Sequence, residues 1–223
     1  MKTLKLIGLP ILLSAVFVLA SATDVDKEIE RINSSTTVLR EFSHMKESIP
    51  HDLIADYKGI VIIPRLLNAG FGIGAKRGKG VAMVRMDDGR WSDPVFVTLT
   101  GGSIGAQIGV QSVDLVLVFR HKGALAKVKN GDFTLGGDLS AAAGPVGRST
   151  SANTDYKLEA EVYSYSRSRG LFAGVSLNGS SLAIDKNADH EFYGEHMSSP
   201  EIFEIGRSTD PAVRELKHTL EGL

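Results

Sequence analysis

The stretch GFGIGAKRGKGVAMV, residues 70–84, places five glycines and three basic residues ahead of a short apolar run. A similar spacing recurs in GLFAGVSLNGSSLAI, residues 170–184, where Gly170 and Gly174 take the places of Gly70 and Gly74. Glycine inside a strand marks a bend, a bulge or a close approach of two backbones. The two stretches therefore predict a sheet that is strongly curved or closed.

Short apolar runs separated by turn residues fill residues 59–186. GIVIIP, GVAMVRM, PVFVTLT and VDLVLVF are typical of strands, and DDGR, KNGD and LNGS contain the Asp-Gly and Asn-Gly pairs that favour tight hairpins. No long amphipathic helical pattern lies between residues 60 and 185, which disfavours βαβ units. We expect a mainly β region over residues 59–186, built as an antiparallel, barrel-like sheet.

Both ends of this β region are expected to be helical. Apolar residues spaced by three and four predict helical structure over residues 23–58, with a second short helix after Pro50. Asp210 precedes Pro211, the arrangement of a capping residue before a helix-starting proline, and this indicates helices within residues 198–222. The predicted fold class is α+β, with a strongly curved or closed sheet flanked by N-terminal and C-terminal helices.

The first 22 residues have the layout of a secretory signal peptide. Lys2 and Lys5 precede an apolar run from Leu6 to Leu19, and small residues follow up to an expected cleavage after Ala22. The run is shorter than the roughly 20 apolar residues of a spanning helix, although a retained anchor is the alternative. We expect export to the periplasm or cell envelope, peripheral to a membrane, with residues 23–223 forming a single domain.

The overall charge gives no reason to expect a nucleic acid partner. The 223 residues contain 25 Lys and Arg against 26 Asp and Glu, a formal charge of −1, whereas nucleic acid binders usually have a strong basic excess. The chain has no cysteine, which excludes disulfides, and its six histidines form no helical i, i+4 pair. No metal site and no cofactor are predicted, so local basic clusters must provide any affinity for anions.

The glycines and basic residues of residues 70–80 also suggest a loop that binds phosphate. A nucleotide site needs such a turn between a strand and the N-terminus of a helix, but Gly80 is followed by VAMVRMDDGRWSDP, a strand that runs into a hairpin. What remains is a glycine-rich hairpin whose tip offers Lys76, Arg77 and Lys79 to several phosphates, or else a solvated loop. Further candidates for anion binding are Arg90 and Arg148.

One motif suggests catalysis. GGSIG, residues 101–105, matches the G-x-S-x-G pattern around Ser103, which in hydrolases exposes the serine on a turn from strand to helix. Here AQIGVQSVDLVLVF continues as a strand. A Ser103-dependent hydrolase is therefore the less favoured hypothesis, and we expect the protein not to be an enzyme.

Taken together, these segments resemble the SYLF domain family. The resemblance covers nearly the whole mature chain in order, through YKGIVIIP, AGFGIGAKRGKGVAMVR, DGRWSDPVFV, GGSIGAQIGVQSVDLVLVF, LGGDLSAAAGPVGR, YSYSRSRGLFAGVSLNGSSL and FYG. It implies a lipid-binding domain. Eukaryotic members bind phosphoinositides through basic surface and an N-terminal amphipathic helix, and some yeast members also bind and bundle actin.

The resemblance leads to a functional expectation with one alternative. We expect non-enzymatic binding of anionic phospholipids at a membrane surface in the cell envelope, through Lys76, Arg77, Lys79, Arg90 and Arg148. Actin binding is not expected for an exported bacterial member, since export removes it from the cytosol. The alternative is a structural or adaptor protein of the envelope that binds a protein partner.

Overall fold

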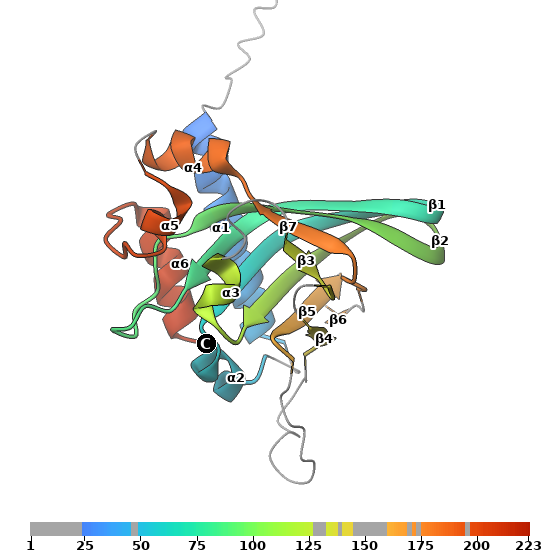
Figure 1. The fold of residues 1–223 in the computed structure, drawn as a ribbon, viewed down its shortest axis with the longest axis horizontal. Coiled ribbons are helices and arrows are strands. Elements are labelled where there is room, and N and C mark those ends of the chain that lie inside the picture. Colours follow the sequence, from blue (N-terminus) through green and yellow to red (C-terminus); the bar gives the residue numbers. More distant parts are fainter. Residues whose placement is uncertain are drawn as a thin grey trace, which may run out of the picture.

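The computed structural model describes residues 24–45, 49–126, 133–137, 140–144, 160–168, 171–172, 175–194 and 197–223. The expected signal peptide (residues 1–22) and Arg148 lie outside the described residues. Figure 1 shows helices gathered at one end of a strongly curved sheet, with two long strands reaching out from the other end.

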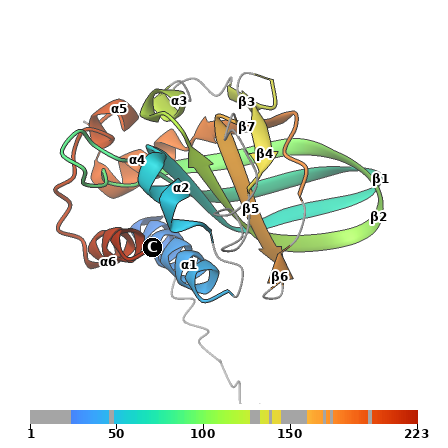
Figure 2. The same cartoon turned by 90° about the horizontal axis from the view of Figure 1, so that it is seen from below.

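Two long strands form the centre of the sheet. β1 (Gly59–Val84) and β2 (Val95–Phe119) run antiparallel, and their register extends from Gly59 opposite Phe119 to Ala82 opposite Val95. The pair forms a two-stranded ribbon that curves back towards the body of the molecule (Figures 1 and 2). We call this β1–β2 pair the ribbon.

The glycines of β1 allow the ribbon to fold back on itself. A Cβ at Gly80 would lie 1.9 Å from the Ile62 carbonyl oxygen, and one at Gly70 would lie 2.7 Å from Cα of Gly74. These close pairs are nearly symmetric about residues 71 and 72, where the β1–β2 register also shifts. The ribbon therefore bends at this point, which we call the tip, and its two halves pack against each other. The strongly curved sheet predicted from glycine spacing is confirmed.

Shorter strands complete the sheet on either side of β2. One end of β2 pairs with β5 and the other with β7, and the remaining strands extend these edges. The bounds are β3 (Phe133–Leu135), β4 (Ala141–Ala143), β5 (Val162–Ser168), β6 (Leu171–Phe172) and β7 (Ser180–Ile184). Every described pair is antiparallel except β4 with β5, which is parallel. The α+β class is thus confirmed, and the antiparallel expectation fails for that one short pair.

The helices lie along the sheet end that is opposite the tip (Figure 1). α1 contacts β1, α4 and α6. The helices are α1 (Asp24–Ser43), α2 (His51–Asp56), α3 (Lys122–Ala126), α4 (Lys186–Tyr193), α5 (Ser199–Ile202) and α6 (Pro211–Glu221). At the start of α6 the Asp210 carboxylate accepts hydrogen bonds from the backbone N–H groups of Ala212 and Val213, the role expected of that capping residue. No helix in the described ranges has the length and apolar character needed to cross a bilayer.

Alternate residues of the ribbon belong to two separate hydrophobic clusters. Ile60 and Ile62 face the helices, in a cluster that includes Leu39 of α1 and Leu216 of α6. Val61 and Ile63 face the other way, into a cluster completed by residues such as Leu125, Leu177 and Leu182. Because side chains alternate along a strand, burial of both faces explains the continuous apolar runs of the sequence.

Candidate functional site

The basic residues of residues 70–80 lie within β1 and not at the tip of a hairpin. Arg77 pairs with Thr100 and Lys79 with Thr98 in the β1–β2 register. Successive side chains of a strand point to opposite faces, so Lys76 faces away from Arg77 and Lys79. The prediction that three cations share one hairpin tip is therefore wrong, because these residues continue the strand and the hairpin turn lies at residues 87–89.

Lys76 points into the body of the protein. It is 4% exposed, and its ammonium group donates a hydrogen bond to the backbone carbonyl of Ser176. Removal from water lowers the pKa of this ammonium group from its ordinary value. In this structure Lys76 joins the ribbon to the segment before β7, and it does not present its charge at the surface.

Lys79 lies on the outer face of β1, the face opposite to that of Lys76, where it contacts a carboxylate. Its side chain is 48% exposed, and Nζ donates a 2.8 Å hydrogen bond to Oδ2 of Asp185. The same Asp185 oxygen lies 3.3 Å from Nη1 of Arg31, whose Nη2 contacts Oε1 of Glu28 at 3.0 Å. Burial opposes ionisation of Asp185, but Lys79 and Arg31 outweigh it and hold its pKa below the usual value. Lys79 thus helps to fix α1 and the start of α4 on the ribbon.

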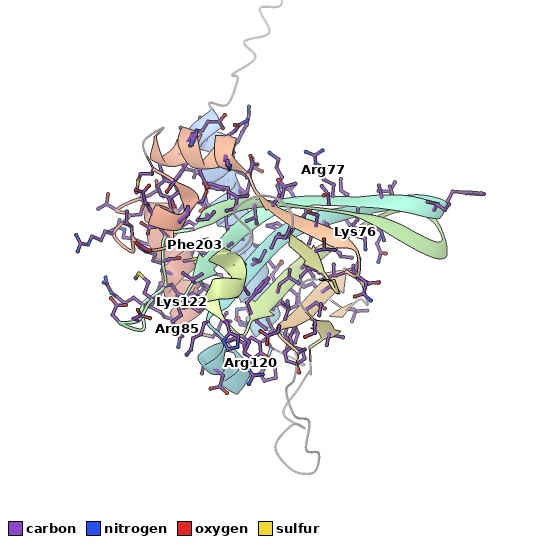
Figure 3. All side chains as sticks on the ribbon, in the orientation of Figure 1. Lys76, Arg77, Arg85, Arg120, Lys122 and Phe203 are labelled. Carbon is purple, nitrogen blue, oxygen red and sulfur yellow. The ribbon has the colours of Figure 1, made fainter. Side chains whose placement is uncertain are left out.

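Arg77 extends from the outer face of β1 into solvent (Figure 3). Within the described part of the chain no ion pair joins Arg77 to a carboxylate. Arg90, in contrast, folds back on the Asp88-Gly89 turn, and its guanidinium group lies 2.6 Å from Oδ2 of Asp88. Hydrogen bonds from Arg90 lower the pKa of Asp88. The four predicted residues that are described are therefore dispersed, and of those at the surface Arg77 has the least compensated charge.

One half of the ribbon, from the tip to Val84 of β1 and Val95 of β2, contains no acidic residue. From Leu66 to Val84, β1 includes three basic residues and no Asp or Glu, and β2 has no charged residue from Val95 to Val113. Acidic residues come close at the β1 bulge near Arg65. The backbone N–H of Arg65 donates a hydrogen bond to Asp114, and Nη2 of Arg65 lies 3.6 Å from Oε1 of Glu30. Past that bulge, towards the tip, the ribbon is positive.

Apolar side chains are exposed around the tip. Phe71 is 77% exposed and Ile73 is 80% exposed, with Val110 at 75% on the adjoining strand and Leu67 at 51%. The sequence interpretation did not identify them, because it treated this stretch as a glycine-rich hairpin whose tip presents cations, or as a solvated loop. Strand alternation would have indicated them, since Phe71, Ile73 and Arg77 have the same parity and share one face.

The structure does not support the catalytic hypothesis. Ser103 lies inside β2, opposite Gly74, and β2 continues to Phe119. The turn from strand to helix that a serine nucleophile requires does not occur there. Among the described residues, no group of three His, Asp or Glu side chains is placed to hold a metal ion.

The described elements form an α+β domain built on a folded-back ribbon. Comparisons with known proteins show the family to which this domain belongs. A family model described as Ysc84, Las17-binding protein actin regulator, matches residues 100–223. The human SH3 domain-containing YSC84-like protein 1 is 37% identical over 185 residues, which cover 80% of this chain and 54% of the human protein. The bovine protein of the same name matches equally. The chain therefore belongs to the SYLF family, as the resemblance in sequence indicated.

A fungal relative extends the comparison. LAS seventeen-binding protein 3 of Saccharomyces cerevisiae is 36% identical over 176 residues, or 78% of this chain and 38% of the yeast protein. The chain thus spans about half the length of the animal relatives and less of the yeast one. The yeast relative is named as a binding protein for another protein, and the family description names Las17 binding and actin regulation.

Proposed function

We propose that this protein is a non-enzymatic domain that binds anionic phospholipids at a membrane surface of the cell envelope. The observation that supports the proposal is the acid-free half of the ribbon, on whose outer face Arg77 and Lys79 lie. The proposed envelope location rests on the signal-like sequence of residues 1–22.

The expected binding is electrostatic and modest. A basic side chain near an anionic bilayer contributes on the order of 1 kcal/mol, and salt weakens the attraction. Lys79 already interacts with Asp185, so Arg77 should contribute more than Lys79 to the binding free energy. Lys76 is excluded from this surface because its ammonium group is buried.

Vesicle sedimentation tests the proposal. The protein without residues 1–22 is mixed with phosphatidylglycerol or phosphatidylcholine vesicles at several salt concentrations. We expect binding to phosphatidylglycerol only, decreasing with salt. Arg77→Glu combined with Lys79→Gln should weaken it about thirty-fold, which corresponds to about 2 kcal/mol.

A matched variant controls for total charge. Arg120→Glu combined with Lys122→Gln makes the same change at exposed positions far from the tip (Figure 3). This control should bind as the wild type does, and circular dichroism should show that both variants stay folded, with a lower melting temperature for the variant that loses the Lys79 contact with Asp185. Equal binding by the two double variants, or equal binding to both kinds of vesicle, would remove the support for a lipid surface on the ribbon.

A second candidate function is that of an adaptor that binds a protein partner in the envelope. It is favoured by the yeast relative, whose name identifies it as a binding protein for another protein. A complex captured from envelope extracts that survives both detergent and high salt would favour this function over lipid binding.

A further inference from the structure

The tip of the ribbon projects beyond the rest of the sheet. In Figures 1 and 2 the bent β1–β2 pair extends away from the helices and from the short strands β3 to β7. In this region β1 pairs with β2 and with no other described strand. The residues at the bend of β1 are Phe71 and Gly72. The tip is therefore in a position to contact something outside the molecule before the body does.

The exposed apolar side chains of the protein are concentrated at this tip. Among the described residues the large apolar side chains that are exposed number six, and four of them are Leu67, Phe71, Ile73 and Val110. Single exposed apolar residues are ordinary on soluble proteins, but a contiguous group on a projecting element indicates an interaction surface. Phe71 and Ile73 are the most exposed members, so they would make the first contact.

The charges beside the tip indicate what covers it. Along the outer face of β1, Ile73 and Arg77 are four residues apart, or about 13 Å at the rise of a strand. Lys79 follows on the same face, and neither strand has a carboxylate from the tip to that point. Apolar side chains at the end of a positive element match an anionic bilayer, in which head groups lie outside the acyl chains. An acidic protein partner would match the cations but not the apolar end.

We infer that Phe71 and Ile73 insert into the outer acyl region of an anionic bilayer while Arg77 contacts the phosphate groups. This inference rests on the proposed function and adds the mode of attachment. Insertion is shallow, because the free edge of β1 has backbone groups that need water or head groups as hydrogen-bond partners. Leu67 and Val110 then lie at the interface beside the inserted pair.

The absence of cysteine from the chain allows a direct test. Ile73→Cys is labelled with an environment-sensitive fluorophore, and Leu171→Cys, which replaces a 73% exposed residue of β6, is labelled as the control. With phosphatidylglycerol vesicles, we expect the label at residue 73 to shift to the blue and to be protected from a water-soluble quencher. The label at residue 171 should do neither.

Affinity provides a second measurement. Phe71→Ser combined with Ile73→Ser should weaken sedimentation with phosphatidylglycerol vesicles by about ten-fold or more, since two apolar side chains no longer leave water. Leu171→Ser, the control, should bind as the wild type does. Both substitutions are at exposed positions, so circular dichroism should show that the fold is retained.

The outcomes separate this inference from the function on which it rests. Salt-sensitive binding with residue 73 still open to the quencher would overturn insertion and leave electrostatic attachment intact. No binding to phosphatidylglycerol vesicles would overturn both. A blue shift at residue 73 that appears without vesicles and grows with protein concentration would overturn insertion, because a second copy of the chain would then cover the tip.

Discussion

Gly80→Ala tests whether the ribbon folds back as the structure shows. A Cβ at this position would lie 1.9 Å from the Ile62 carbonyl oxygen and 2.9 Å from Cα of Ile63, whereas real Cβ contacts essentially never come under 3.0 Å. The obstacle is backbone, so no rotamer change relieves it, and the two halves of the ribbon must separate by about 1 Å. Overpacking in a core costs about 1 to 3 kcal/mol, and displacement of backbone places this case at about 3 kcal/mol or more.

The assay is thermal and urea unfolding of Gly80→Ala beside Gly102→Ala. Gly102 belongs to the same ribbon, but a Cβ there would meet no atom within 4 Å. For a domain of this size, 3 kcal/mol lowers the melting temperature by about 6 to 12 °C. Gly102→Ala should change the free energy of unfolding by less than about 1 kcal/mol in either direction. If the two variants were equally stable, the close packing of the two ribbon halves would be refuted.

Two further predictions concern buried ionisable groups. Burial raises the pKa of Asp189 from 3.8 to about 6, even though Phe96 N–H and Ser199 donate hydrogen bonds to its carboxylate. The folded state thus holds this proton more tightly than the unfolded state. The resulting stability is fully present below about pH 4 and is lost as the pH rises through 6. Relative to Asp189→Asn, the free energy of unfolding in urea should fall by about 2 to 3 kcal/mol between pH 4 and pH 7, and a pH-independent difference would contradict this assignment. For Lys76→Met, affinity for phosphatidylglycerol vesicles should stay within about two-fold of the wild type because the side chain faces inward. A loss as large as that of the Arg77 and Lys79 double variant would show that Lys76 reaches lipid.

Much of the fold could be predicted because local patterns and tertiary structure agree. Apolar runs predicted four separate strands, which are the two ends of β1 and the two ends of β2. The glycines within β1 indicated the strong curvature. Asp210 before Pro211 marked the start of α6, where its carboxylate does cap the first turn. The short parallel pair of β4 and β5 could not be predicted, since three alanines give no signal of strand direction.

The candidate surface was harder to predict because glycine permits both a loop and a bent strand. If residues 70–80 formed a loop, the side chains of Lys76 and Arg77 would be presented together at its tip. Treated as a strand, these residues place the two side chains on opposite faces, and only folding of the ribbon determines that the Lys76 face is inside. The contact between Lys79 and Asp185 joins residues 106 positions apart, so no local pattern could reveal it.

The ribbon separates the two hydrophobic clusters and supplies side chains to both. β1 and β2 contribute side chains to both clusters. If these strands lose their packing in one cluster, the other cluster therefore loses its packing too. Melting of the helical side should therefore expose the opposite side at the same time, and the domain should unfold in a single cooperative transition. The two strands that project furthest from the body are thus also the strands on which the folding of the whole domain depends.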